Sequence, residues 1–180
     1  NNMVDEMFDY GRFILKNKRE NPSEDLLSAI ANAKIEDKKL TDEFLDGSWL
    51  LIIFAGNDTT RNTMSGGIKL LHENQKQKDL LMQNLDLLPN FINETVRCVS
   101  PVIHMRRTSL QETEINGQKI GPYEKISLWY GAANRDPDIF KNPDEFNILR
   151  ENADKHLAFG IGRHTCLGKP VALMQLREFY

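Results

Sequence analysis

Several features that define other protein classes are scarce in this chain of 180 residues. Only two cysteines are present, Cys98 and Cys166, which are too few for a disulfide framework and favour a reducing, cytoplasmic location. The longest apolar run, 49–55, is far shorter than the ~20 residues that a membrane span needs, and no signal peptide is visible at the start. Basic residues are scattered and outnumbered by acidic ones, 23 against 26, so nucleic-acid binding is not indicated.

The remaining composition is that of an ordinary globular protein, with 40% hydrophobic residues, 27% charged residues and a net charge of −3. This length is enough for one domain with a sizeable core. The first residue is not Met, and Tyr180 falls within an amphipathic helical pattern. We therefore expect an internal segment of a longer protein.

Helical periodicity dominates the first hundred residues. It predicts helices over 3–17, 23–33, 41–72, 74–84 and 87–100, with Ser23 as the cap of the second helix and a charged turn at 34–39. At 1.5 Å per residue the helix over 41–72 is ~45 Å long, enough to cross a whole domain. Pro101 ends the last helix of this series.

The pattern then changes to short strands, predicted at 103–110, 113–115, 119–120 and 125–130. Asn116-Gly117 predicts a type I′ hairpin turn. Residues 131–158 show little periodicity and predict an ordered but irregular connection before a final helix at 169–180. The predicted class is mainly α with a small β-sheet.

The ten residues from Phe159 to Gly168 carry the strongest chemical signal. Glycines at 160, 162 and 168 leave the backbone free to approach a flat object closely. The helical run that follows puts Cys166 near a helix N-terminus, where N–H donors and the dipole favour a thiolate. Such a thiolate is a soft iron ligand that favours cleavage of an O–O bond.

Other readings of this stretch have less support. A cysteine is most often a small buried hydrophobe. A dinucleotide-binding loop would need its third glycine at the position of Thr165, and a zinc site at His164 and Cys166 lacks a second pair of ligands at a suitable spacing.

The stretch resembles the haem-binding loop of the cytochrome P450 family, whose pattern is Phe-x-x-Gly-x-Arg/His-x-Cys-x-Gly. The resemblance implies that Cys166 is the axial thiolate ligand of haem b and that Phe159 shields this thiolate from water. It also implies that His164 binds a haem propionate. The loop glycines Gly160, Gly162 and Gly168 would lie against the cofactor.

Within the long predicted helix, the run Ala55-Gly56-Asn57-Asp58-Thr59-Thr60 consists largely of weak helix formers. The Thr59 hydroxyl is placed to bond the Ala55 carbonyl and open the helix locally, although a tolerated packing kink is the alternative. The run resembles the Ala/Gly-Gly-x-Asp/Glu-Thr motif of the family's distal helix. That resemblance implies an O₂ groove at Ala55 and Gly56, and proton delivery by Asp58 and Thr59.

Glu94 and Arg97 lie at i, i+3 on one predicted helix, a spacing that alone most often means a solvated salt bridge. By resemblance they are the family's Glu-x-x-Arg signature, which forms a buried structural network with a later arginine, here Arg150. Arg106 and Arg107 point to opposite faces of a predicted strand. Of the two, Arg107 matches the family's propionate-binding arginine better.

Taken over the whole chain, the resemblance implies that 1–180 is the C-terminal part of a single P450 catalytic domain without its N-terminal part and final strands. A long central helix would lie over the haem, with the cysteine loop beneath it. The implied activity is that of a monooxygenase that uses O₂ and takes electrons from NAD(P)H through a ferredoxin and its reductase.

The segments 56–62, 104–108 and 174–177 are most similar to bacterial terminal alkane hydroxylases, which implies an apolar small-molecule substrate. One alternative is a peroxygenase driven by H₂O₂, which is disfavoured because such enzymes tend to lack the acid–alcohol pair. A haem-binding sensor or carrier is the other alternative, and it would have no use for that pair.

Overall fold

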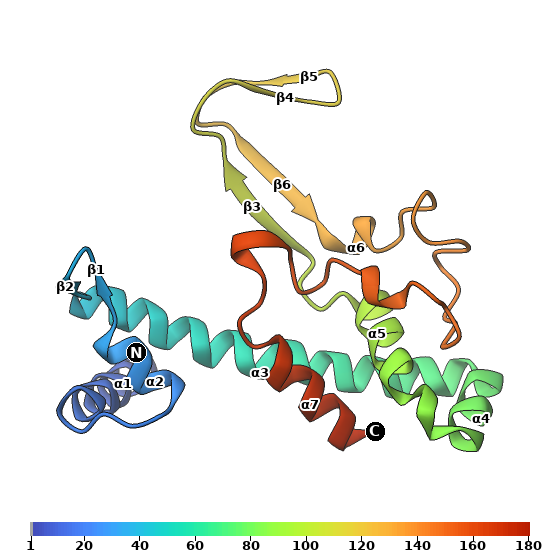
Figure 1. The fold of residues 1–180 in the computed structure, drawn as a ribbon, viewed down its shortest axis with the longest axis horizontal. Helices are drawn as coiled ribbons and strands as arrows, with labels where there is room; N and C mark the ends of the chain where they lie inside the picture. The colour runs from blue at the N-terminus through green and yellow to red at the C-terminus, as the bar shows by residue number, and fades with distance from the viewer. Residues whose placement is uncertain (1) are drawn as a thin grey trace. The chain divides into compact units, whose positions relative to one another are not determined.

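The computed structural model describes residues 2–180, which form two compact units divided at Asn57 and Asp58. The helix α3 (Asp42–Glu73) contributes its first part to one unit and its second part to the other (Figure 1). Helices dominate, and the strands form three small antiparallel pairs. The predicted class, mainly α with a small amount of β, is confirmed. None of the helices in residues 2–180 is long and apolar enough to cross a membrane.

The first unit is built from helices that pack on a small core. Its elements are α1 (Asn2–Glu20), α2 (Leu26–Asn32), β1 (Lys34–Ile35), β2 (Lys38–Lys39) and the start of α3. Leu15, Ala31, Leu45 and Trp49 form the buried core. The Trp49 indole donates a hydrogen bond to the Met7 carbonyl at 3.1 Å.

Of two local predictions in this unit, one was wrong and the other was incomplete. Asp25, not Ser23, caps α2, because its carboxylate accepts the Ser28 N–H at 2.8 Å while the Ser23 hydroxyl donates to the same carboxylate. The expected turn at 34–39 is a miniature hairpin, since β1 pairs with β2 around Glu36 and Asp37. Both turn residues adopt positive φ, 49° and 60°, without a glycine to mark the turn in the sequence.

The second unit places short elements around the second part of α3. These are α4 (Gln75–Gln83), η1 (Leu85–Leu87), α5 (Leu88–Val99), β3 (His104–Thr108), β4 (Thr113–Ile115), β5 (Gln118–Ile120), β6 (Lys125–Trp129), α6 (Tyr130–Ala133), η2 (Ala153–Lys155), η3 (Gly162–His164) and α7 (Lys169–Phe179). Side chains from α4, α5, α7 and the irregular segment share one core: Leu81, Phe91, Ile92, Val96, Phe146, Ile148, Ala158 and Leu176.

Two glycines let α3 approach its neighbours closely. A Cβ atom on Gly66 would lie 2.5 Å from Val99 of α5, and one on Gly67 would lie 2.0 Å from the Tyr180 hydroxyl. That hydroxyl also lies 2.9 Å from the carbonyl oxygens of Thr63 and Met64. We call Gly66 and Gly67 the glycine notch of α3.

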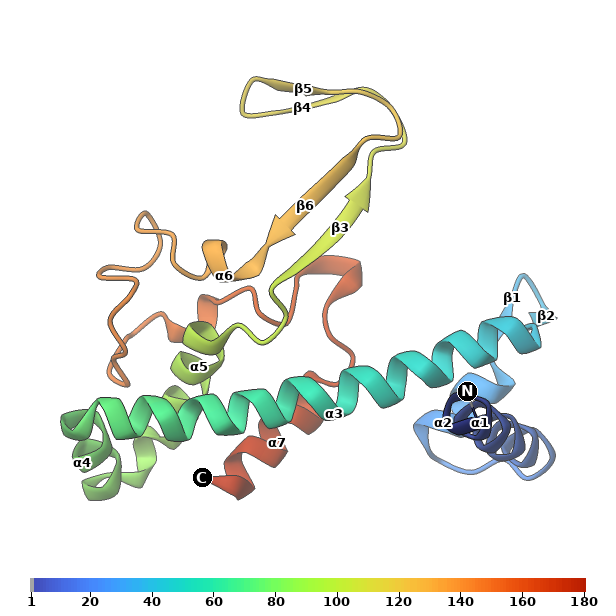
Figure 2. The same cartoon turned by 180° about the vertical axis from the view of Figure 1, so that it is seen from behind.

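Strand β3 pairs antiparallel with β6, and the two continue into the β4–β5 hairpin, as both views of the chain show (Figures 1 and 2). The hairpin turn at Asn116 and Gly117 has φ of 48° and 80°, the positive values that the predicted type I′ turn requires. The strands form two separate two-stranded ladders in place of one continuous sheet.

Candidate functional site

The loop that carries Cys166 connects the irregular segment to α7. Its first and last parts are tied together because the Cys166 N–H donates to the Phe159 carbonyl at 2.8 Å. Gly160 and Gly162 have φ of +69° and +70°, values that side chains other than glycine rarely adopt. A Cβ atom on Gly160 would also lie 3.1 Å from the His164 carbonyl. Gly160 and Gly162 are therefore required by the shape of the loop, whereas Gly168, with φ of −80°, is not.

The Cys166 side chain is exposed, and no hydrogen bond to its sulfur occurs within residues 2–180. Apolar side chains of the same loop and of the start of α7 are also uncovered: Ile161 and Leu167 are each 76% exposed, and Val171 is 53% exposed. A free soft donor among uncovered apolar side chains fits a large apolar cofactor held through sulfur. This donor set therefore fits haem.

The Phe159 ring stands at the base of the loop. It packs against the core of the second unit, and its ring centre lies 5.6 Å from that of His156 and 5.5 Å from the Lys169 ammonium. The His156 Nδ1 accepts the Ala158 N–H at 3.2 Å. Burial, reinforced by the charge of Lys169, lowers the pKa of His156 to about 4, so this ring is neutral at pH 7.

The two arginines of β3 differ in how their guanidinium groups are engaged. Arg107, which is half-buried, donates to the Arg106 carbonyl at 2.9 Å. Arg106 is exposed, and within residues 2–180 its guanidinium makes no hydrogen bond. His164, in η3, is exposed as well. The structure thus leaves Arg106 more available to an anion than the sequence comparison of the two arginines indicates.

Along α3, the helix continues without interruption through residues 55–60. The Asp58 carboxylate accepts hydrogen bonds from Arg61 at 3.1 Å and from Asn62 at 3.0 Å, and it is exposed. Thr59 is half-buried, and its carbonyl accepts the Thr63 hydroxyl at 2.8 Å. This last bond was not anticipated from the sequence.

Ala55 and Gly56 are exposed on the same helix. A Cβ atom on Gly56 would have no heavy atom within 4 Å from the side chains and loops of the described chain. The space beside this part of α3 is therefore not filled by residues 2–180.

The structure brings Glu94, Arg97 and Arg150 together in one buried network. Glu94 accepts two bonds from Arg97, at 2.7 and 2.9 Å, and two from Arg150, at 3.0 and 3.1 Å. Glu94 and Arg97 are completely buried, and Arg150 is 7% exposed. These distances and this burial are those of a charge-assisted internal network and not of a surface pair.

The remaining N–H groups of the two arginines are bound by backbone carbonyls of the irregular segment. Arg97 donates to the carbonyls of Asn134, Pro143 and Glu145. Arg150 donates to the carbonyls of Lys141, Asn142 and Glu145. Segment 131–158 lacks periodicity and is nevertheless ordered, because its polar backbone atoms are bound by buried arginines.

Asn134 is a site-supporting residue that the sequence did not reveal. It is fully buried, its amide donates to the Ser100 hydroxyl at 2.8 Å, and its side-chain oxygen accepts the Leu157 N–H at 2.6 Å. With its own carbonyl bound to Arg97, it links the network to the segment that enters the cysteine loop. A single Asn in an irregular region gives no sequence signal that would distinguish it from a turn residue.

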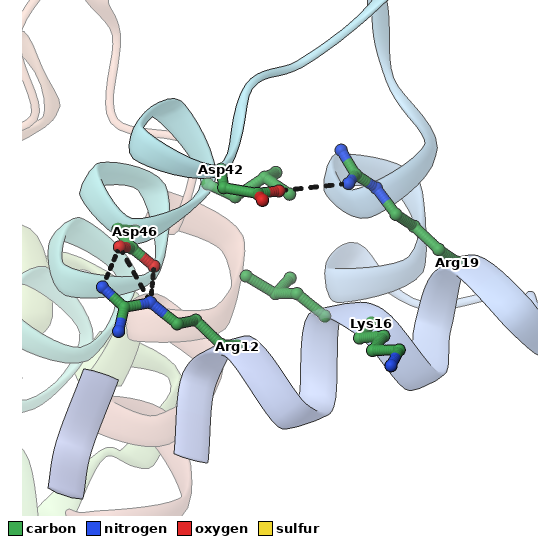
Figure 3. Close-up of a pocket in the computed structure, with 7 residues that line it drawn as sticks. Arg12, Lys16, Arg19, Asp42 and Asp46 are labelled. Carbon is green, nitrogen blue, oxygen red and sulfur yellow. Dashed lines mark hydrogen bonds and ion pairs between the residues drawn. The ribbon is translucent and has the colours of Figure 1, made fainter. Parts of the chain in front are cut away.

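A separate pocket of about 310 Å³ lies in the first unit, lined by Arg12, Leu15, Lys16, Arg19, Asp42, Leu45 and Asp46. Figure 3 shows Arg12 reaching towards Asp46 and Arg19 towards Asp42, while Lys16 points away from both pairs. The carboxylates at this pocket are already matched by arginines. Across residues 2–180, no group of three or more His, Cys, Asp or Glu side chains is placed to hold a metal ion.

Comparisons with known proteins identify relatives of almost the whole chain. The linalool 8-monooxygenase of Pseudomonas putida is 38% identical over 178 residues, which cover 99% of this chain and 44% of that protein. A steroid C26-monooxygenase of Mycolicibacterium smegmatis is 38% identical over 169 residues, covering 94% of this chain and 42% of that protein. The chain therefore spans less than half the length of the curated relatives that it matches.

Among solved structures, cytochrome P450-153 from Novosphingobium aromaticivorans superposes with a TM-score of 0.90 at 38% identity. The superposition covers 99% of this chain and 44% of that one. The family model of cytochrome P450 matches residues 1–179. With the exposed cysteine loop and the buried Glu94 network in place, the chain belongs to the cytochrome P450 family.

Proposed function

We propose that the protein containing this chain is a haem-thiolate monooxygenase, and that residues 1–180 form the C-terminal part of its single catalytic domain. The observation that carries this proposal is the Cys166 loop, whose backbone is fixed by the bond to Phe159 while its sulfur remains free and exposed. When bound there, haem would supply the activation of O₂ and the insertion of one oxygen atom into a C–H bond.

The residues of this chain divide the work among them. Cys166 would hold the iron through its sulfur. Arg107 or Arg106, together with His164, would bind the propionates, since all three side chains are cationic or hydrogen-bonding and at least partly accessible. Glu94, Arg97 and Arg150 would keep the segment before the loop in place, a structural role.

Asp58 and Thr59 would manage protons. Asp58 is exposed and bonded to Arg61 and Asn62 on the helix surface, so it is in a position to exchange protons with solvent. Thr59, the next residue, is half-buried and would pass a proton inward through its hydroxyl. Ala55 and Gly56 would leave room for O₂ beside the helix.

The substrate is proposed to be an apolar chain that is hydroxylated at its end, as in terminal alkane hydroxylases. Support comes from the resemblance of segments 56–62, 104–108 and 174–177, and from relatives named as monooxygenases of linalool and of a steroid. Those names indicate molecules that are also largely apolar. We further propose electron supply from NAD(P)H through a ferredoxin and its reductase, in the cytoplasm, where two free cysteines would stay reduced.

The test uses the full-length protein, purified with haem. The proposal expects the red-shifted absorption band of a thiolate-ligated carbon-monoxide complex after reduction. It also expects NADH consumption with ferredoxin and reductase that rises when a medium-chain alkane is added, with the primary alcohol as product. Turnover with H₂O₂ alone at the same rate would favour the peroxygenase. Haem binding without oxidation of an alkane, linalool or a steroid would favour the sensor.

A further inference from the structure

A cation–π pair closes the cysteine loop at its base. The Lys169 ammonium lies 5.5 Å from the centre of the Phe159 ring. Phe159 opens the loop and Lys169 is the first residue of α7, so the pair joins the two ends of the segment that contains Cys166. On its other contact, the Phe159 ring lies against His156.

Both members of the pair are also bonded to Cys166 through the backbone. The Cys166 N–H donates to the Phe159 carbonyl at 2.8 Å, and the Lys169 N–H donates to the Cys166 carbonyl at 3.3 Å. A change at either side chain therefore acts on residues that directly hold the backbone of Cys166.

The position of Lys169 is unusual for a cation. The N-terminus of a helix carries partial positive charge, which disfavours a lysine there. Among residues 2–180 no carboxylate pairs with the Lys169 ammonium, which lies over the aromatic face of Phe159 instead. Its charge also acts inward, since it is the largest charge effect that lowers the pKa of the neighbouring His156.

This inference rests on the proposed function, in which Cys166 holds haem iron. We propose that Lys169 is a positioning residue that, through Phe159, closes the loop and holds a positive charge three residues from Cys166, thereby raising the reduction potential of the bound haem. The physical reason is that reduction adds negative charge to the iron–thiolate pair. A fixed cation nearby stabilises the reduced form more than the oxidised form.

The experiment measures the haem reduction potential of the full-length protein in the absence of ferredoxin. Lys169→Gln should lower the equilibrium constant for reduction about tenfold, which is 59 mV for a one-electron couple. Lys169→Arg should stay near the unmodified value, because a guanidinium also stacks on an aromatic face. Arg163→Gln is the matched control: it removes an exposed cation of the same loop that has no aromatic partner in the described chain.

A second arm tests whether Lys169 acts through Phe159. In a Phe159→Leu background, Lys169→Gln should change the potential much less than it does in the unmodified protein, because the ammonium is no longer held. Full additivity of the two changes would overturn the proposal, as would equal shifts in Lys169→Gln and Arg163→Gln.

An unchanged potential with a raised KM for ferredoxin in Lys169→Gln would overturn the proposal in favour of a contact with the redox partner. These results are separable from a failure of the proposed function. If the unmodified protein lacks the thiolate carbon-monoxide band, both proposals fail. If the band is present and Lys169→Gln leaves the potential unchanged, only the role of Lys169 fails.

Discussion

Two regions of the second unit differ in whether their polar groups have hydrogen-bond partners within the chain. In the Glu94 network, every nitrogen of the Arg97 and Arg150 guanidinium groups and both oxygens of Glu94 have partners inside the chain. In the cysteine loop, the Cys166 sulfur has no hydrogen-bond partner within residues 2–180, and the apolar side chains of Ile161 and Leu167 in the same loop are mostly exposed. The network is complete within this chain, whereas the loop is shaped to be completed by other atoms.

The largest effect is expected in the cysteine loop. Cys166→Ser in the full-length protein should abolish the red-shifted carbon-monoxide band and all monooxygenase activity, because serine offers no soft thiolate to iron. The absorption spectrum of the reduced protein under carbon monoxide measures this. Survival of the band would mean that another residue is the ligand.

The other cysteine supplies the control for that experiment. Cys98 lies in α5, and burial raises the pKa of its thiol to about 11, so it stays protonated at neutral pH and is a poor metal ligand. Cys98→Ala should therefore retain the band and bind haem normally.

The next largest effect is expected in the Glu94 network. Glu94→Ala leaves two buried arginines without a carboxylate and should cost about 3–5 kcal/mol of unfolding free energy, with loss of haem. Denaturant unfolding and the haem content after purification measure both. Glu145→Ala removes an exposed carboxylate of segment 131–158 and keeps the backbone carbonyl that binds the arginines, so it should change stability by less than about 0.5 kcal/mol. A soluble, haem-replete Glu94→Ala protein would contradict the structural role.

At Thr59 of α3 we expect a smaller effect on stability but a clear effect on the yield of product per NADH. Thr59→Ala should leave haem and substrate binding nearly intact and lower the yield of product per NADH, with more oxygen leaving as H₂O₂. Thr60 is 9% exposed and points about 100° further round the helix, so Thr60→Ala should mainly reduce stability. A larger loss of coupling in Thr60→Ala would show that Thr60 is the proton-delivery residue.

The last effect is confined to acidic pH and concerns the segment that joins the two regions. His156 has a folded-state pKa of about 4 against an ordinary value of 6.5, so the unfolded chain binds more protons between these values. Its contribution to stability is therefore complete above pH 6.5 and is lost as the pH falls towards 4. At most about 3 kcal/mol is involved. His156→Gln should flatten the fall in denaturation midpoint over this window, and an unchanged slope would contradict the assignment.

The regular elements were predictable because their signals are local. The helical periodicity of α3 and α4 and the Asn116-Gly117 turn each depend on a few neighbouring residues. Ser23 was mistaken for a cap because both Ser and Asp are favoured at that position, and the helix begins two residues later than predicted, so that Asp25 accepts the Ser28 N–H.

The candidate site was predictable only where a motif marked it. The motif around Cys166 and the spacing of Glu94 and Arg97 are visible in the sequence, but the carbonyls that Arg97 and Arg150 bind belong to residues of any type. Backbone partners leave no trace in side-chain identity. For the same reason Asn134 and the bond from Thr63 to the Thr59 carbonyl emerged only in three dimensions.

The glycine notch of α3 determines how far this helix can slide along its own axis. Because Gly66 and Gly67 have no side chains, Val99 and Tyr180 pack directly against α3 at this one position along its axis. A shift of α3 by one turn would place the side chain of Thr63 or Leu70 at that position and push α3 away from α5 and α7. Thr59 lies eight residues from Gly67, about 12 Å along the axis. The two glycines thus fix the position of α3 along its axis, and with it the position of the Thr59 hydroxyl relative to α7.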